Sequence, residues 1–359
     1  MKTTKVFWLS FILSLFSFSN VKSNAVDVMT FHTDMLTSHL FSDILQDNKG
    51  YIWIATEYGL NKYDGSHFTH YFATGQEGAL SNNSVRRLGV DNSGNLFVLC
   101  DNWIQRYDCT SDKFINIPDN DGNFVRAADI AIKDNTILVV SDDSQIFSYE
   151  NGKLIKRTKL TESIPSSIET RRIFIDNRNS IWLGTLDNGV YRIDSDGKRI
   201  RHFYTPQLSG ESINSIVSTA DGTIFIASST KLWRYNSSDE SLHAINHDEG
   251  FSSIRDLIVT SNDIPLIGTY GRGLYYFDKI TDSCRPLSKL MNISQALSTG
   301  NVTTLYQDRD NNLWTGCFNE GLVLSARNPS VFTAIDVSTL KGGNFRPVTM
   351  IHNSRDGYI

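Results

Sequence analysis

The sequence predicts an all-β fold, a seven-bladed β-propeller of four-stranded antiparallel blades. Three observations support this: one pattern recurs at regular intervals, its apolar runs are short and separated by turn residues, and no run between them is long enough for a crossover helix. The pattern is clearest in "DNKGYIWIATEYGLNKYDG" at residues 47–65. It returns as "DNRNSIWLGTLDNGVYRID" at 176–194 and "DRDNNLWTGCFNEGLVLSA" at 308–326.

The period of the pattern sets the number of blades. One bulky apolar residue in each copy can be aligned as an anchor, and successive anchors lie 41 to 48 residues apart. Four-stranded propeller blades repeat about every 40–45 residues. The anchors are Trp53, Phe97, Leu138, Trp182, Phe225, Leu266 and Trp314.

Each copy is expected to contain four strands, a to d. In the first copy strand a is "FSDILQD" (41–47), strand b "YIWIAT" (51–56), strand c "GLNKYD" (59–64) and strand d "HFTHYF" (67–72). These runs are rich in β-branched and aromatic residues, and Asn, Asp and Gly separate them, which is typical of β-hairpins. Each blade is therefore predicted to be an antiparallel meander.

The need for the same turns and the same packing residue explains why the pattern recurs. An Asp begins the a–b turn, where its carboxylate accepts bonds from nearby main-chain amides. A Gly or Asn later in the turn tolerates positive φ, and a Gly before strand c closes the b–c hairpin. The Trp anchors are expected to be buried between neighbouring sheets. The turn positions are Asp47, Asp91, Asp176 and Asp308, then Gly50, Gly222, Asn179 and Asn311, then Gly59, Gly189, Gly273 and Gly321.

Two segments compete to close the ring. "VMTFH" (28–32) resembles a strand d with no a, b or c strand of its own, and it is predicted to pair with strand c of the seventh blade near residues 321–325. "VFTAI" (331–335) is the alternative for the same edge. "VTMIHNSRDGYI" (348–359) restarts the repeat. We therefore expect the propeller over residues 26–335 and the truncated start of a further repeat or second propeller over 336–359.

The first 25 residues are predicted to be a signal peptide. Lys2 and Lys5 precede the apolar run "VFWLSFILSLFSF" (6–18), which is too short for an ordinary membrane span, and Ser23 and Ala25 offer cleavage points. An uncleaved anchor is the alternative. Either way, the rest of the chain is expected to work outside the cytoplasm.

Composition excludes several kinds of function. The chain is 40% apolar and 20% charged, with a net charge of −5 and no basic clusters, which argues against nucleic acid as a partner. Its cysteines and histidines lack metal-ligand spacing, and no catalytic motif is present. We expect no metal, no cofactor and no catalytic residues. The four cysteines are expected to be too far apart for disulfides, and therefore free and buried.

Loops on one face are the candidate binding region. The d–a and b–c loops share that face and are the longer and more varied ones, and binding usually sits on variable loops carried by a rigid scaffold. Arg86, Arg171 and Arg255 occupy one repeat position, one residue into strand a of blades 2, 4 and 6. Strand a should line the channel, so the three could converge on a carboxylate or sulfate. The alternative is that each Arg pairs with an Asp of a neighbouring blade, such as Asp101 or Asp187.

Aromatic residues of the b–c loops are the second candidates, because aromatic faces stack on sugar rings. They are Tyr58, Trp103 and Tyr270, and Trp103 is expected to be exposed because it stands where other blades have the hairpin Gly. Their polar neighbours could bond to sugar hydroxyls. The alternative role of the aromatic residues is packing within the loops. The polar neighbours are Asn102, Asn188, Arg272 and Asn319.

The repeat resembles a known family. A signal peptide followed by D-x-x-G-x-[IL]-W-[IL]-[AG]-T-x-x-x-G-L blades is similar to the two-component-regulator propeller repeats of hybrid two-component sensors from Bacteroides-type bacteria. The start "LTSHLFSDILQDNKGYIWIATEYGLNKYDGSHF" (36–68) is especially similar. The motif is strong in blades 1, 4 and 7 and degraded in the other four. The resemblance covers residues 26–359.

The resemblance implies a function that the residues alone do not give. In that family two propellers precede a small β-sandwich, a membrane helix, a histidine kinase, a receiver and often a DNA-binding domain. It implies a periplasmic module that detects glycan-derived oligosaccharides and controls genes for carbohydrate use. The three aligned arginines favour an acidic oligosaccharide over a neutral one. Expected partners are the second propeller and kinase domains and a second copy of the chain. The alternative is a secreted propeller glycoside hydrolase or polysaccharide lyase.

Overall fold

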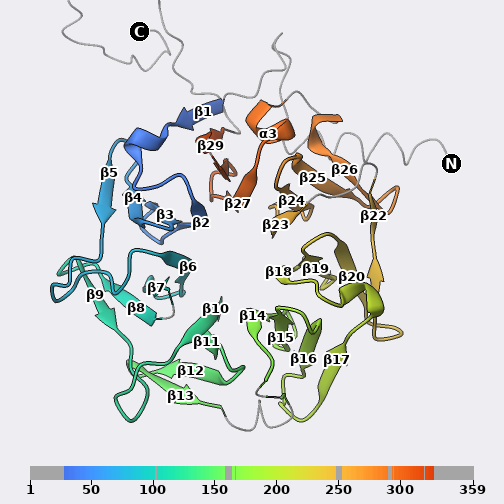
Figure 1. Ribbon diagram of the computed structural model, residues 1–359, viewed down its shortest axis with the longest axis horizontal. Helices are drawn as coiled ribbons and strands as arrows, with labels where there is room; N and C mark the ends of the chain where they lie inside the picture. The colour runs from blue at the N-terminus through green and yellow to red at the C-terminus, as the bar shows by residue number, and fades with distance from the viewer. Residues whose placement is uncertain are drawn as a thin grey trace, which may run out of the picture. The chain divides into compact units, whose positions relative to one another are not determined.

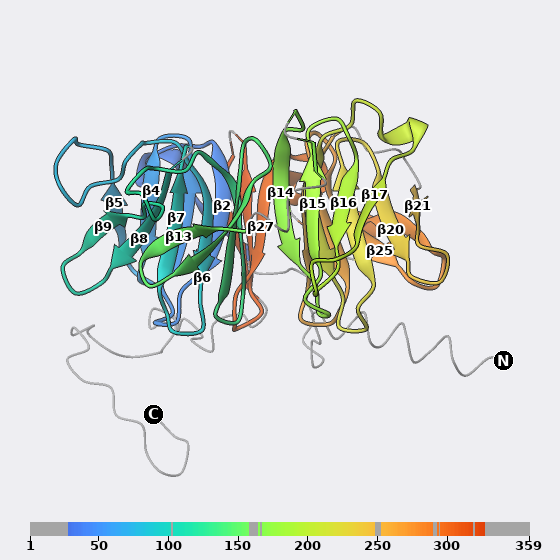
Figure 2. The ribbon, with the colours of Figure 1, turned by 90° about the horizontal axis from the view of Figure 1, so that it is seen from below.

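The computed structural model describes residues 28–326 except 102, 158–163, 166, 248–252, 290–292, 294 and 319. In this part of the chain seven antiparallel sheets stand around a common axis (Figure 1). Seen from the side, the strands run between the two faces of a disc (Figure 2). The prediction of a seven-bladed β-propeller is confirmed. The predicted signal peptide, the segment 331–335 and the expected further repeat lie outside the described residues.

Blades 1 to 7 follow in chain order, and strand a is the innermost strand of each. Blades 1 to 3 contain β2 (Phe41–Gln46), β3 (Ile52–Thr56), β4 (Gly59–Tyr63), β5 (Phe68–Tyr71), β6 (Val85–Val90), β7 (Leu96–Cys100), β8 (Trp103–Asp108), β9 (Lys113–Asn116), β10 (Ala127–Lys133), β11 (Thr136–Ser141), β12 (Ile146–Glu150) and β13 (Lys153–Lys156). Blades 4 and 5 contain β14 (Thr170–Ile175), β15 (Ile181–Thr185), β16 (Val190–Ile193), β17 (Ile200–Phe203), β18 (Ile213–Ser218), β19 (Ile224–Ser228), β20 (Leu232–Asn236) and β21 (Ser241–Ala244). Blades 6 and 7 contain β23 (Ile254–Val259), β24 (Pro265–Thr269), β25 (Gly273–Asp278), β26 (Ser283–Pro286), β27 (Val302–Gln307), β28 (Leu313–Cys317), β29 (Gly321–Ser325) and β1 (Val28–Phe31).

Short elements occupy the connections between blades. β22 (Asn246–His247) adds a parallel edge to β26 in blade 6. The described helical turns are η2 (Thr33–Met35), η3 (Pro206–Leu208), η4 (Leu287–Lys289) and α3 (Gln295–Thr299). Within the described residues, none of the helices has the length and apolar character needed to span a bilayer.

The seven anchor residues are all buried, as predicted. Trp53 is inaccessible to solvent and packs against Leu88, Val98 and Tyr107 of the next blade. Trp182 likewise packs against residues of blade 5, and Trp314 against residues of blade 1. The hydrophobic core is therefore divided into clusters that each lie between two neighbouring blades, and each anchor residue is packed between two sheets. Burial of such side chains stabilises the fold by about 1.5–3 kcal/mol each.

The a–b turns of blades 1, 4 and 7 share a contact that the sequence analysis did not predict. One carboxylate oxygen of Asp47 accepts the main-chain amides of Lys49 and Tyr51 at 2.9 and 3.0 Å, as expected. The other accepts the indole N–H of Trp53 at 2.8 Å. The same carboxylate–indole bond joins Asp176 to Trp182 at 2.9 Å and Asp308 to Trp314 at 2.8 Å. The turn is thereby tied to the anchor.

The predicted Gly positions are explained by positive φ and by close backbone approach. Gly189 has a φ of 69°, and a Cβ there would lie 2.3 Å from the carbonyl oxygen of Phe203 in strand d. Gly321 has a φ of 99°, and its Cβ would lie 2.3 Å from the carbonyl oxygen of Phe31. A side chain at either position would push strand d away from strand c.

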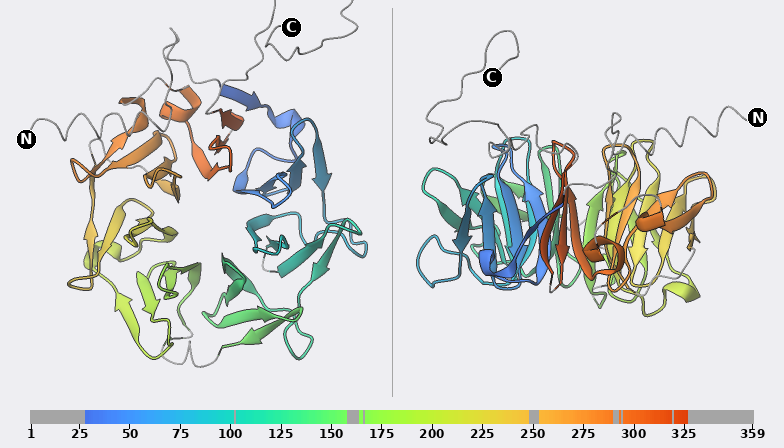
Figure 3. Two further views of the ribbon diagram at one scale, coloured as in Figure 1. Left: turned by 180° about the vertical axis from the view of Figure 1, so that it is seen from behind. Right: turned by 90° about the horizontal axis from the view of Figure 1, so that it is seen from above.

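The ring is closed by β1, which pairs antiparallel with β29. Val28 lies opposite Ser325, and Phe31 lies opposite Leu322. Phe31 is buried and its ring stacks against Trp314 at a centroid distance of 5.9 Å. Figure 3 shows the blue first strand beside the red strands of the last blade. The prediction that residues 28–32 complete the seventh blade is confirmed.

The cysteines are free, as expected, but one of them is not buried. Cys100, Cys284 and Cys317 are buried in their blades. Cys109 is exposed because it follows β8 in the c–d turn, where the chain leaves the sheet. The expectation of a buried thiol is wrong for Cys109.

Candidate functional site

Every blade carries a β-bulge at the start of strand a. In blade 2 the pairing of β6 with β7 shifts register between Val85 and Arg87. The same shift occurs at the equivalent place in the other six blades. A bulge inserts an extra residue and re-aims the side chains around it. The second and third residues of strand a, which would otherwise face opposite ways, can therefore both face the axis.

The bulge creates two rings of side chains around the axis. We call the second residues of the innermost strands the upper ring and the third residues the lower ring. The upper ring is Ser42, Arg86, Ala128, Arg171, Asn214, Arg255 and Thr303. The lower ring is Asp43, Arg87, Asp129, Arg172, Ser215, Asp256 and Thr304.

One cavity of about 480 Å³ is lined by the entire upper ring. Arg87, Arg172 and Asp256 of the lower ring also line it, together with Glu57, Tyr270 and Phe318. Five arginines and two carboxylates therefore face the same space. Three further carboxylates, those of Asp43, Asp129 and Glu169, pair with Arg87 and Arg171, so five carboxylates stand around the five arginines.

Three predicted arginines converge in this cavity, as the alignment indicated. Arg86 donates from Nη1 to the main-chain carbonyl of Asp101 at 3.2 Å. Nε of Arg171 lies 3.2 Å from the carboxylate of Glu169, which is two residues earlier in the chain. Its ion-pair partner is therefore Glu169 and not Asp187, the residue named in the alternative. Arg255 lies over the ring of Tyr270, 5.3 Å from the ring centroid.

Tyr270 is the one predicted aromatic residue that the cavity includes. Its ring lies 6.0 Å from that of Phe318, which also lines the cavity. An aromatic ring beside a guanidinium offers a stacking face and a hydrogen-bond donor in one place. The pair therefore presents both an aromatic face and a guanidinium to the cavity.

The other predicted residues lie outside the wall of this cavity. Trp103 is exposed, as expected, but its ring stacks on Phe124 at 4.9 Å and 15°. Tyr58 is exposed, and its ring centroid lies 6.0 Å from that of Phe72. Both therefore also take part in loop packing, the alternative role.

Two predicted polar residues also lie away from the cavity. The side-chain oxygen of Asn188 accepts a bond from the Tyr191 hydroxyl at 3.2 Å, and its main-chain carbonyl bonds to His202 at 2.8 Å. Arg272 is exposed on the b–c loop of blade 6. Asn102 and Asn319 lie outside the described residues.

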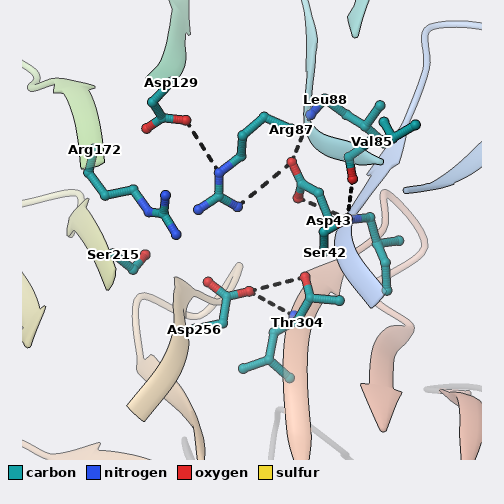
Figure 4. Close-up of polar contacts among 12 residues, drawn as sticks. Ser42, Asp43, Val85, Arg87, Leu88, Asp129, Arg172, Ser215, Asp256 and Thr304 are labelled. Carbon is teal, nitrogen blue, oxygen red and sulfur yellow. Dashed lines mark hydrogen bonds and ion pairs between the residues drawn. The ribbon is translucent and has the colours of Figure 1, made fainter. Parts of the chain in front are cut away.

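The lower ring is built by carboxylates that reach from one blade to the next. Oδ2 of Asp43 accepts the main-chain amide of Leu88 in blade 2 at 2.8 Å. Asp129 accepts that of Ile173 in blade 4 at 2.9 Å, and Asp256 that of Leu305 in blade 7 at 2.8 Å. Each bond fastens two neighbouring blades beside the axis, and Figure 4 shows those of Asp43 and Asp256.

The two lower-ring arginines have different surroundings. Arg87 lies between two carboxylates, with Nε 3.3 Å from Asp129 and Nη1 3.9 Å from Asp43. Arg172 donates to the main-chain carbonyls of Asn214 and Arg171. Figure 4 shows both guanidinium groups directed into the same space.

Burial shifts the proton affinities of this cluster. It raises the pKa of Asp43 to about 6, although Arg87 and the amide of Leu88 act in the opposite direction. Burial, followed by the repulsion of Arg87, lowers the pKa of Arg172 to about 10. Burial also disfavours the charge of Arg87, but the attraction of Asp129 and Asp43 outweighs it, so the pKa of Arg87 is raised. The charges of Asp43, Arg87 and Arg172 therefore act on one another, and those of Asp129 and Asp256 act on all three or on two of them.

Sequence reasoning found the three arginines of the upper ring and did not single out any residue of the lower ring. Regular alternation places only every second side chain of strand a toward the axis, so the residues next to Arg86 and Arg171 were not considered. The available signal was the adjacent pair of arginines at the start of two strands, 86–87 and 171–172, where a buried strand should not carry two successive charges.

Sequence comparison identifies the repeat. A profile of the two-component regulator propeller matches residues 35–58 and 296–319. These two segments match the two-component regulator propeller repeat. The first spans the a and b strands of blade 1, and the second spans those of blade 7. No curated protein sequence matches the chain.

Solved structures with the same fold include extracellular domains of two hybrid two-component systems from B. thetaiotaomicron. The first is 19% identical with a TM-score of 0.72, and 85% of this chain covers 42% of it. The second is 22% identical with a TM-score of 0.65, and 84% of this chain covers 40% of it. The regulator propeller thus spans about two fifths of each. Virginiamycin B lyase from Staphylococcus aureus is 13% identical with a TM-score of 0.65, and 84% of this chain covers 99% of it.

Proposed function

We propose that this regulator propeller is the ligand-sensing module of a hybrid two-component sensor and that it binds an acidic oligosaccharide derived from a glycan. The observation that carries the proposal is the single cavity lined by all seven upper-ring residues, with Arg86, Arg171 and Arg255 among them. Seven blades contribute to one hollow, so a ligand bound there contacts the whole ring at once.

The chemistry of the cavity favours an acidic sugar over a neutral one. Arginine forks bind carboxylate and sulfate through two parallel hydrogen bonds. Asn214, Ser42 and Thr303 supply neutral polar groups of the kind that bond to sugar hydroxyls, and Tyr270 supplies an aromatic face. Tyr58, Trp103, Asn188 and Arg272 are proposed contacts for sugar units that extend beyond the cavity.

The surroundings of Asp256 favour binding over catalysis. The carboxylate accepts the amides of Leu257 and Leu305 at 2.8 Å each and lies 3.3 Å from the Thr304 hydroxyl. A carboxylate held by three donors is a poor general base, because each donor stabilises its charge. The alternative, a secreted glycoside hydrolase or polysaccharide lyase, would have to use Glu57, the other carboxylate that lines the cavity.

The remaining parts of the proposal come from the family. The sensor would place this propeller in the periplasm and use its occupancy to control genes for carbohydrate use. A second propeller, a membrane helix, a histidine kinase and a second copy of the chain would be its partners. The extracellular domains that share the fold are more than twice as long as the part that aligns with this chain, which leaves room for a second propeller.

Calorimetry with a panel of acidic and neutral oligosaccharides tests the proposal. A charge-assisted hydrogen bond contributes roughly 1.5–3 kcal/mol, so Arg255→Ala is expected to weaken binding of an acidic ligand about ten-fold or more. The loss should be largest at low ionic strength. Trp103→Ala, outside the cavity wall, should have a smaller effect that salt does not change.

Two results would contradict the proposal. Equal affinity of wild type and Arg255→Ala for every ligand of the panel would move the site elsewhere. Release of shortened or unsaturated products from an oligosaccharide would support the enzyme instead.

A further inference from the structure

The lower ring contains two arginines at equivalent positions, and they differ in their partners. Arg87 has two carboxylates, Asp129 and Asp43, on either side of it. Arg172 has main-chain carbonyls instead, with Nη1 2.8 Å from the carbonyl oxygen of Arg171. Among the residues that the structure describes, no carboxylate lies within ion-pair distance of the Arg172 guanidinium. Asp129, Asp256 and Asp43 stabilise its positive charge only from beyond that distance.

The carboxylates of the lower ring are already engaged. Asp129 is held by the amide of Ile173 and by Arg87, and Asp43 by the amides of Leu88 and Ile44. Asp256 is held by two amides and the Thr304 hydroxyl. Because these bonds fix neighbouring blades, none of the three can turn toward Arg172 without opening an interface.

The position of Arg172 makes its charge costly without an anion. The residue is partly buried, it faces Arg87, and it lines the same cavity as the upper ring. Its pKa, although lowered to about 10, keeps the guanidinium protonated at neutral pH. A buried charge is tolerated best when it is paired and hydrogen-bonded. An anion entering from the cavity would supply that pair.

We propose that Arg172, assisted by Arg87, forms a subsite for one carboxylate or sulfate group beneath the upper ring. The inference rests on the proposed function and deepens it: the acidic group of the ligand enters the lower ring, while Arg86, Arg171 and Arg255 contact the sugar units above. Nε and Nη1 of Arg172 already donate to main-chain carbonyls, so Nη2 and the second hydrogen of Nη1 form the edge that would bind a carboxylate or sulfate through parallel bonds.

Inorganic sulfate is the probe that tests the subsite alone. Wild type is expected to bind sulfate in calorimetry and to show a higher melting temperature in sulfate than in chloride of equal ionic strength. Arg172→Gln is expected to weaken sulfate binding about ten-fold or more and to remove the difference between the salts. Arg172→Lys, which keeps the charge but loses the fork, should bind with intermediate affinity.

A matched control separates the subsite from general charge effects. Arg234 lies on β20 and pairs with Asp282 at the outside of the ring. Arg234→Gln removes one positive charge as well, and it should leave sulfate binding unchanged. Equal sulfate affinity in wild type and Arg172→Gln, or a wild type whose melting temperature is the same in both salts, would overturn the inference.

Oligosaccharides with and without an acidic group then separate the two proposals. If sulfate requires Arg172 and no oligosaccharide binds, the subsite stands and the proposed function falls. If an acidic oligosaccharide binds wild type and Arg172→Gln equally but loses affinity in Arg255→Ala, the proposed function stands and the subsite falls. A loss in both variants, confined to acidic oligosaccharides, supports both.

Discussion

The two ends of the innermost strands differ in what recurs from blade to blade, a side-chain contact at one end and a backbone bulge at the other. At the a–b end, blades 1, 4 and 7 repeat one contact, the carboxylate–indole bond, with lengths of 2.8, 2.9 and 2.8 Å. At the d–a end the backbone repeats instead: the bulge recurs in every blade, but the side chains that it presents change from Ser to Arg to Ala to Asn.

This difference separates residues that hold the fold from residues available for a ligand. The carboxylate–indole bond recurs with the same partners in three blades, where it fixes the a–b turn and the position of the Trp that packs against the next blade. The β-bulge recurs in every blade with different side chains, so it sets where the upper-ring side chains lie without requiring a particular residue there. Arginines therefore gather at the d–a end without disturbing the repeat.

The largest expected effect is at the a–b end. Asp176→Ala removes the acceptor of the Trp182 indole and of two turn amides. A buried donor left without a partner costs about 1–3 kcal/mol, so we expect a loss of roughly 3 kcal/mol in the free energy of unfolding, measured by urea denaturation. The control is Asp91→Ala, because Asp91 begins the equivalent turn of blade 2, whose anchor Phe97 has no N–H. Equal losses in the two variants would remove the special role of the indole bond.

A smaller effect is expected from Asp43, which belongs to the lower ring at the d–a end. Its pKa is raised to about 6 in the folded protein, from 3.8. Its contribution to stability is therefore fully present below about pH 4 and is lost as pH rises through about 6. Asp43→Asn stays neutral, so wild type should lose on the order of 2 kcal/mol relative to the variant between pH 4 and 7. The charged groups that act on Asp43 are Arg87 and Asp256.

Urea denaturation of wild type and Asp43→Asn across this pH range provides the measurement. If wild type instead gained free energy of unfolding relative to Asp43→Asn as pH rises from 4 to 7, that result would contradict a raised pKa. Asp43→Asn should also bind sulfate more tightly than wild type at pH 7.5, because it removes a negative charge beside Arg87.

The smallest effect on stability is expected in the upper ring. Arg171 pairs with Glu169, and both side chains are well exposed, at 39% and 52%. Exposed ion pairs contribute about 0–1 kcal/mol, so Arg171→Ala should change the free energy of unfolding by less than about 0.5 kcal/mol. A loss comparable to that of Asp176→Ala would mean that the upper ring also holds the fold, and the comparison between the two ends would fail.

The sequence could predict the fold because its signals are local. Asp47 marks a turn, Gly321 marks a hairpin, and the Trp spacing gives the period, and each of these needs only a few neighbouring residues. The alignment also placed Arg86, Arg171 and Arg255 together, since equivalent positions of a ring face one axis.

The lower ring could not be predicted because it depends on the bulge. A bulge is a property of strand pairing, and the adjacent arginines at 86–87 and 171–172 are the one local sign of it in the sequence. The ion-pair partner of Arg171 could not be predicted from the sequence either, because the conformation of the loop before strand a brings Glu169 close to it. The b–c loop residues Tyr58 and Trp103 were predicted as surface groups, but loop geometry sets them apart from the cavity.

The joint between β1 and β29 gives the ring a mechanical weak point. Val28, the first residue of β1, lies opposite Ser325, the last residue of β29. A load pulling these two residues apart would act along the hydrogen bonds of an antiparallel ladder and across its strands. It would open the pairs in sequence from Val28–Ser325 to Phe31–Leu322. At the far end the ring of Phe31 packs against Trp314, Tyr63 and Phe68, so these contacts would be the last to open.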